Sequence, residues 1–169
     1  MGRPAAAAGA PAGAAVGDVG AAAEAPGVAA AAGATDEAAA DDVAAAGATV
    51  NVASGTFTGS GDSVVNIIER NITLQGQGSS TIVDGENVRR GFNITGGSTV
   101  TLAGFKITNG SLSSGEGGLL DGGGIQVSSS NLTVDRTTIS GNSGNLGGGI
   151  FSSDSNLTVR NSTISGNSA

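Results

Sequence analysis

Residues 122–143 read GGGIQVSSSNLTVDRTTISGNS, and residues 147–168 read GGGIFSSDSNLTVRNSTISGNS. The second stretch repeats the first at an offset of 25 residues, and most of the aligned positions are identical. Self-similarity at a fixed period of about 20–50 residues is typical of solenoids, in which each repeat is one unit of a stack. This pair of repeats therefore predicts a chain of stacked coils.

Fainter copies of the unit extend upstream to about residue 48. A hydrophobic, polar, hydrophobic triplet recurs at residues 50–52, 72–74, 100–102, 132–134 and 157–159. A second apolar position recurs at Phe57, Ile82, Ile107, Ile139 and Ile164, and a weaker third recurs at Phe92/Ile94, Ile125/Val127 and Ile150. Each unit therefore holds about three short β-runs, and the Gly, Asn and Ser between them suit chain corners.

The predicted fold is all-β: a right-handed parallel β-helix (solenoid) of about five coils with a short N-terminal capping helix. One coil cannot bury its apolar side alone, so we expect coils to stack about 4.8 Å apart, with Val52 over Leu74 over Leu102. A β-sandwich also has short strands and frequent turns, but it does not require near-identical sequence at a period of 25. A leucine-rich repeat would show a much richer leucine frame.

Three segments are expected along the chain. Residues 1–34 form a low-complexity Ala/Gly-rich leader, predicted to be disordered because it lacks large apolar side chains. An export signal after Arg3 is an alternative for this leader, although Gly and Pro interrupt it. Residues 35–47 form the capping helix, and residues 48–169 form the parallel β-helix.

The capping helix is predicted from its ends. Thr35 is a suitable N-cap, and Asp36 and Glu37 suit the positive end of the helix dipole. The alanines that follow favour helix, and Gly47 suits the position after the last turn. Placed before the first coil, such a helix would cover the open end of the core.

One interruption breaks the regular repeat. Ile107 and Ile125 are 18 residues apart, whereas Ile139 and Ile150 are 11 apart, so seven extra residues are expected to bulge out at 111–121. The chain stops in mid-repeat, which exposes a β-edge. We therefore expect it to be the N-terminal part of a longer repeat protein.

Composition excludes several function classes. The chain has 31 Gly, no Cys, no His, no Trp and no Tyr. The lack of His removes the commonest general base and metal ligand. The net charge is −7 and no basic stripe is present, which argues against a nucleic-acid partner. No apolar run is long enough for a transmembrane helix.

The repeats resemble those of a known bacterial group. GGGI at 122–125 and 147–150, followed by ISGN at 139–142 and 164–167, resembles repeats of the polymorphic outer membrane protein type. The same stretch resembles choice-of-anchor β-helix proteins, and residues 47–57 and 72–85 are similar to the first coils of pectin-lyase-like proteins. The resemblance implies a secreted or outer-membrane-associated, cell-surface β-helix.

The resemblance also implies a possible enzyme, because enzymes of this superfamily usually cleave acidic polysaccharides with the help of carboxylates. Asp84, Glu86, Arg89 and Arg90 cluster within DGENVRR, but position 84 aligns with Asn109 and with glycines in later coils, so no acidic ladder is predicted. The favoured interpretation is a solvated loop. Glu116 and Asp121, in the 111–121 interruption, are a weaker hypothesis for a cation or sugar site.

Two further patterns are candidates for surface roles. Sequons occur at Asn71, Asn93, Asn131, Asn156 and Asn161. We interpret them as corner asparagines that stack between coils rather than as glycosylation sites. Thr73, Thr101, Thr133 and Thr158 are expected to form one outward column, a weak sign of an ordered-water or ice-binding face because no second Thr column stands beside it.

The sequence thus predicts a non-catalytic secreted or cell-surface β-helix module of the adhesin, passenger or spacer type. No catalytic, cofactor-binding or metal-binding residue is assigned. The expected partners are an extracellular polysaccharide or a host or cell-surface component, and the oligomeric state stays open. The alternative is the N-terminal part of a polysaccharide lyase or glycoside hydrolase whose active coils lie elsewhere.

Overall fold

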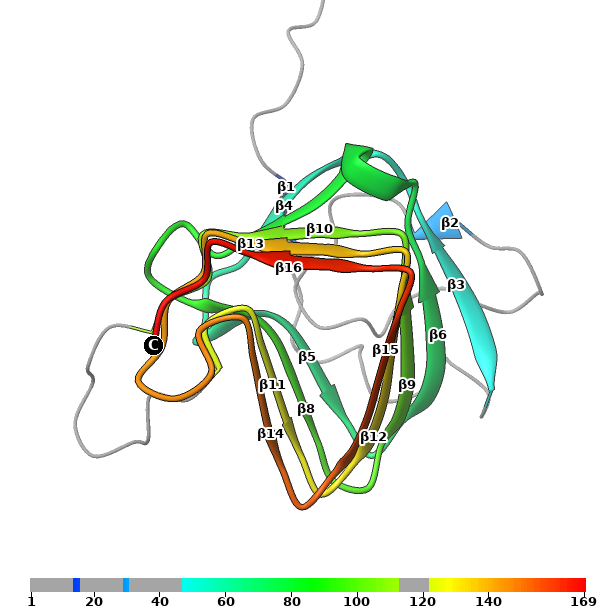
Figure 1. Ribbon diagram of the computed structural model, residues 1–169. Helices are drawn as coiled ribbons and strands as arrows, with labels where there is room; N and C mark the ends of the chain where they lie inside the picture. The colour runs from blue at the N-terminus through cyan, green and yellow to red at the C-terminus, as the bar shows by residue number, and fades with distance from the viewer. Residues whose placement is uncertain (1–13, 16–28, 31–46, 113–121) are drawn as a thin grey trace, which may run out of the picture.

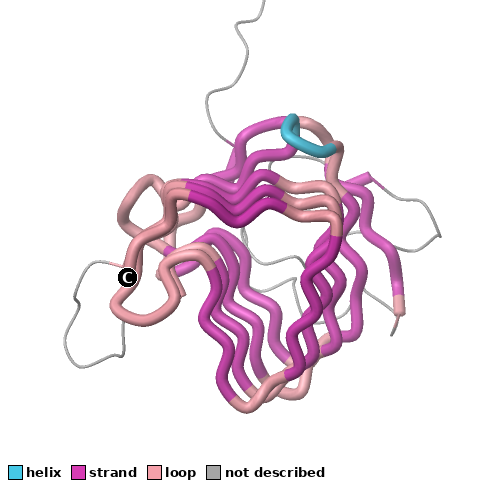
Figure 2. Tube along the Cα trace, viewed as in Figure 1, coloured by secondary structure: helices cyan, strands magenta, loops and turns pink. Residues whose placement is uncertain are grey.

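The computed structural model describes residues 14–15, 29–30, 47–112 and 122–169, and these form a right-handed parallel β-helix. Each coil contributes one strand to each of three parallel sheets, which form the sides of a three-sided stack (Figure 1). In Figure 2 successive coils lie over one another, as stacked strands require. The predicted fold class is therefore confirmed.

The three sheets are named here by their strands. Sheet A contains β1 (Ala14–Ala15), β4 (Gly55–Thr58), β7 (Thr81–Asp84), β10 (Lys106–Thr108), β13 (Thr138–Ser140) and β16 (Thr163–Ser165). Sheet B contains β2 (Ala29–Ala30), β3 (Ala48–Val52), β6 (Asn71–Gln75), β9 (Thr99–Ala103), β12 (Asn131–Asp135) and β15 (Asn156–Arg160). Sheet C contains β5 (Ser63–Ile68), β8 (Arg90–Thr95), β11 (Ile125–Ser128) and β14 (Ile150–Ser153).

The strands β3 to β14 make four complete coils, and β15 and β16 add two strands of a fifth. A short 3-10 turn, η1 (Gly78–Ser80), precedes β7. The leader and capping helix predicted over residues 1–47 lie outside the described residues, apart from β1, β2 and Gly47. Those two predictions therefore stay predictions.

The core is built from inward rows that continue from coil to coil. Leu74, Leu102 and Val134 are directly paired across sheet B and are at most 2% exposed. In sheet C, the expected third row is confirmed, because Ile125 pairs with both Phe92 and Ile150. Alternation along each strand places every second side chain inside, so the rows merge into one apolar core.

The register of the first coil differs from the prediction. Val50, not Val52, pairs with Leu74, and Ala48 pairs with Ile72. A shift of two residues keeps the same face inward, so the apolar alternation could not distinguish the two registers. The backbone N–H of Gly47 donates to the carbonyl of Asn71 at 2.8 Å, and this hydrogen bond is made in the observed register, with Val50 opposite Leu74.

The predicted inward residue of β7 is wrong by one position. Val83, not Ile82, is the inward residue, and it pairs with Phe57 and with Ile107. The reason is Thr81, whose buried hydroxyl donates to the carbonyl of Ala53 at 3.1 Å. With Thr81 held inside, alternation turns Ile82 outward.

The GGGI and ISGN elements interlock at the corner between sheets A and C. The Asn142 side chain is 1% exposed; it accepts from the backbone N–H of Gly110 at 2.7 Å and donates to the Ile107 carbonyl at 3.2 Å. A Cβ on Gly124 would lie 2.4 Å from the carbonyl oxygen of Gly149, so this corner has no room for a side chain. The two motif elements therefore pack neighbouring coils tightly against one another at this corner.

The predicted interruption lies between β10 and β11. Sixteen residues connect these strands, whereas nine connect β13 to β14. The seven additional residues are therefore placed as expected. Residues 113–121, with Glu116 and Asp121, lie outside the described residues, so the site hypothesis for those two acids is not tested.

Candidate binding surface on sheet B

The outer face of sheet B carries one straight row of threonines, which we call the threonine row. Its members pair directly from strand to strand: Thr49, Thr73, Thr101, Thr133 and Thr158. They face outward because the residues beside them, such as Ile72 and Leu74, are buried. The predicted column is confirmed, and the corrected register of β3 adds Thr49 to it.

A second polar row runs beside the first on β6, β9, β12 and β15, two residues earlier on each of these strands. We call it the asparagine row, and it consists of Asn71, Thr99, Asn131 and Asn156. The Asn156 amide donates to Asn131 Oδ1 at 2.8 Å, and Asn71 Oδ1 accepts from the backbone N–H of Thr99 at 3.1 Å. The sequence indicated stacked asparagines at Asn71, Asn131 and Asn156, but it did not indicate that they stand beside the threonine row and that Thr99 continues their row.

Asparagines at the other sequons also bridge coils. Asn93 donates to Asn66 Oδ1 at 2.8 Å, and Asn161 donates to Asp135 Oδ1 at 2.9 Å. Side-chain amides that stack between coils satisfy one another along the axis. Stacking of asparagine on asparagine is therefore confirmed for Asn131 with Asn156 and for Asn93 with Asn66. Asn93 lies within β8 and not at a corner, and Asn161 bonds an aspartate instead of an asparagine.

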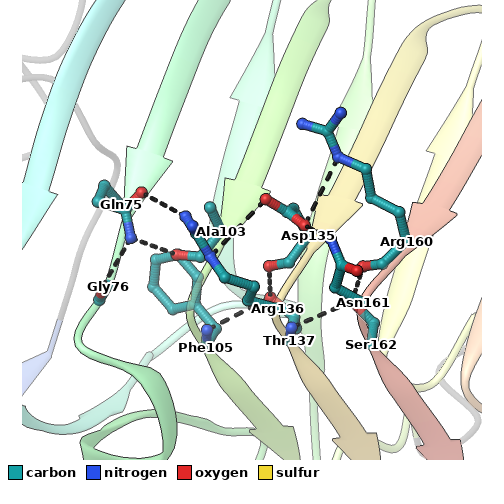
Figure 3. Close-up of polar contacts among 10 residues, drawn as sticks. All are labelled: Gln75, Gly76, Ala103, Phe105, Asp135, Arg136, Thr137, Arg160, Asn161 and Ser162. Atoms are coloured by element: carbon teal, nitrogen blue, oxygen red, sulfur yellow. Dashed lines mark hydrogen bonds and ion pairs between the residues drawn. The ribbon is translucent and has the colours of Figure 1, made fainter.

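A charged corner lies where sheet B turns into sheet A (Figure 3). Asp135 lies at the end of β12, and its carboxylate is within 3.5 Å of Arg160 Nε and 3.7 Å of Arg136 Nε. Arg136 has a positive φ of 47° and its guanidinium also donates to Gln75 Oε1 at 3.3 Å. It reaches past the intervening coil, whose residue in register with Gln75 is the small Ala103.

Hydrogen bonding and neighbouring charges favour the ionised form of Asp135. The side-chain hydrogen bond from Asn161 lowers the pKa of Asp135 below its ordinary value, and the charges of Arg160 and Arg136 lower it further. Burial acts in the opposite direction, but it does not prevail. The corner therefore combines one carboxylate with two guanidiniums that are 61% and 60% exposed, for Arg136 and Arg160 respectively.

The DGENVRR residues are engaged within their own corner. Asp84 accepts from both the Asn109 amide at 3.1 Å and the Glu86 backbone N–H at 2.8 Å. Arg89 contacts Glu86 and donates from Nε to the carbonyl of Gly61 at 3.2 Å. Asp84 and Glu86 therefore make structural contacts within their own coil, and Asp84 also connects it to the next coil.

Two details of the prediction for the DGENVRR residues are wrong. Asp84 pairs in register with Thr108, and not with Asn109, because the register of β7 is shifted by one residue. Arg90 is 8% exposed at the start of β8, so it is not part of a solvated loop. In the described part of the chain, no group of three or more acidic side chains converges to hold a metal ion.

No protein family, curated protein or solved structure matches this chain. Among the described residues, no helix has the length and apolar character needed to cross a membrane. The chain is thus characterised by its own geometry: a parallel β-solenoid with a two-row hydroxyl and amide face and one charged corner.

Proposed function

We propose that this chain is a non-catalytic β-helix module, secreted or held at a bacterial cell surface, that acts as a spacer, passenger or adhesin. The finer resemblance to polymorphic outer membrane, choice-of-anchor and pectin-lyase-like repeats belongs to the same proposal. A stack of parallel coils makes a rod, and each added coil lengthens it by about 4.8 Å. Such a rod holds its outer faces at a fixed distance from an anchoring point.

One observation supports the non-catalytic part of the proposal: in the described part of the chain, Asp84 and Asp135 hold residues of the scaffold together. Asp84 is bound by Asn109, and Asp135 is bound by Asn161. General acid–base catalysis needs a carboxyl group within hydrogen-bond reach of the substrate, with a pKa near the working pH. The lowered pKa of Asp135 is the opposite of what a general acid requires.

The charged corner supports a contact with acidic surface components. Arg136 and Arg160 are both about 60% exposed, and together they outnumber the single carboxylate of Asp135. A guanidinium binds carboxylate or sulfate groups through paired donors. Acidic extracellular polysaccharide is therefore the proposed partner of this corner.

A binding and turnover experiment tests the proposal. The purified chain is incubated with pectate, alginate and neutral glycans, and unsaturated products, reducing ends and bound glycan are measured. We expect no product, with retention of acidic glycans that falls in the double variant Arg136→Ala/Arg160→Ala but not in Lys106→Ala on sheet A. Release of product by the chain would contradict the non-catalytic role, and equal retention by both variants would remove the corner as the contact.

Location is tested separately. An antibody against the chain should label intact cells of the source bacterium or recover the protein from its medium. Recovery only from the cytosol would contradict secretion.

A further inference from the structure

The threonine row and the asparagine row together form a regular array, which we call the Thr–Asn face. Neighbouring strands in a sheet lie about 4.8 Å apart, and outward side chains on one strand lie about 6.6 Å apart, at two rises of about 3.3 Å. The pairing is direct and without a bulge across β3, β6, β9, β12 and β15. The face therefore repeats in two directions with fixed spacings.

The hydroxyls of the threonine row are available to a ligand. Within the described part of the chain, none of these five hydroxyls is occupied by a hydrogen bond to another residue. Each offers one donor and two acceptor positions beside a methyl group. Because Thr is branched at Cβ, its χ1 is restricted, so hydroxyl and methyl positions recur from strand to strand.

The face is also rigid and most regular at one end. Strands β9, β12 and β15 lie nearly over one another, whereas β3 and β6 fan outward in the view along the axis (Figure 1). Backbone ladders connect each strand to the next, and the Asn156 to Asn131 bond adds a side-chain tie. Thr101, Thr133 and Thr158 therefore form the straightest part of the row.

The charge and chemistry of the face restrict its ligand. Neither row contains an ionised side chain. The nearest charges on this face, Asp135 and Arg160, lie two residues beyond Thr133 and Thr158 and pair with each other at 3.5 Å. The chain contains no Trp or Tyr, so the face also lacks the aromatic platforms on which sugar rings stack. What remains is an uncharged ligand that repeats in two dimensions and accepts and donates hydrogen bonds at every repeat.

An ordered water lattice has this chemistry. In hexagonal ice, oxygen atoms repeat along two perpendicular directions at spacings close to those of the sheet, and every oxygen both donates and accepts hydrogen bonds. The methyl groups of the row disfavour disordered water between the side chains, and the hydroxyls supply lattice positions. We propose that the Thr–Asn face binds the surface of ice, an activity independent of the proposed adhesive role.

The experiment measures the effect of the purified chain on single ice crystals. The gap between melting and freezing temperatures, the crystal shape and the recrystallisation of ice are recorded for the unchanged chain. For the unchanged chain we expect the freezing temperature to lie measurably below the melting temperature, and the ice crystals to be faceted. The variant Thr101→Lys/Thr133→Lys places two long charged side chains in the straightest part of the row and should lose both effects.

Matched controls separate a lost surface from a lost fold. Thr138→Lys/Thr163→Lys makes the same change on paired positions of sheet A and should keep the activity. Far-UV circular dichroism verifies that both variants are folded. If the double lysine variant of sheet B does not fold, Thr133→Val replaces it, because this change removes only one hydroxyl. Thr133→Val should reduce the difference between the melting and freezing temperatures.

Three outcomes would overturn the proposal. The first is no gap, no faceting and no inhibition of recrystallisation by the unchanged chain. The second is activity that survives on a folded sheet B variant. The third is retention on insoluble neutral polysaccharide, lost in the sheet B variant, without any effect on ice, which would make the face a glycan-binding surface instead.

Discussion

The substitution Asn142→Ala tests the interlock between the GGGI and ISGN elements. Asn142 accepts from the buried N–H of Gly110 and donates to the carbonyl of Ile107. Its amide also donates to Asn167 Oδ1 at 2.9 Å, but that oxygen keeps the backbone N–H of Asn142 as a donor at 3.0 Å. The substitution therefore removes the side-chain partner of the Gly110 donor and weakens the hydrogen bonding of the Ile107 acceptor.

The expected magnitude follows from these two groups. A buried donor without a partner costs about 1–3 kcal/mol, and the weakened acceptor adds about 1 kcal/mol, so the free energy of unfolding should fall by about 2–4 kcal/mol. For a urea slope near 2 kcal/mol per M, the unfolding midpoint should fall by roughly 1–2 M. Because small domains are stable by only about 5–15 kcal/mol, this loss is large.

The assay is urea unfolding followed by far-UV circular dichroism, since the chain has no Trp or Tyr to report by fluorescence. The matched control is Asn156→Ala, at an exposed asparagine whose one side-chain bond goes to Asn131. Its free energy of unfolding should change by less than about 0.5 kcal/mol. If the two variants differ by less than about 1 kcal/mol, the reasoning about the interlock is wrong.

Three further predictions use the same unfolding measurement. Gly124→Ala should cost about 1–3 kcal/mol, because its Cβ would lie 2.4 Å from a carbonyl oxygen of the next coil, whereas Gly61→Ala meets nothing within 4 Å and should be nearly neutral. Val83→Ala should lower the free energy of unfolding by about 1.5–3 kcal/mol and Ile82→Ala by about 1 kcal/mol or less. If Ile82→Ala had the larger effect, Ile82 and not Val83 would be the inward residue of β7. Asp135→Asn should destabilise the protein at neutral pH, and its difference from the unchanged chain should vanish as the pH falls through the lowered pKa of Asp135; a difference that persists at low pH would contradict this assignment.

The sign of the Asp135 prediction follows from the direction of its pKa shift. The folded protein holds the pKa of Asp135 below its unfolded value, so the ionised carboxylate stabilises the fold. This contribution is fully present above the unfolded pKa and is lost as the pH falls through the folded pKa. Added salt should reduce the part that comes from the exposed Arg136 and Arg160.

Much of the candidate surface could be foreseen from the repeats. The 25-residue period indicated Thr133 beside Thr158, and the triplets indicated that both face outward. The charged corner could not be foreseen, because Arg136 contacts Gln75, which is 61 positions away and in a coil of different sequence. Such a contact depends on the intervening coil, which has the small Ala103 in register with Gln75, and no local sequence pattern predicts it.

The sequence by itself determined the period, the parallel stacking and the inward face of most strands. Those properties depend on the alternation of side chains along a strand, which is local. Only the tertiary structure decided that Val50 lies over Leu74 and that Val83 rather than Ile82 enters the core. The physical reason is that alternation identifies a face but not a register; register is set where corner groups such as Gly47 and Thr81 form hydrogen bonds to residues distant in the sequence.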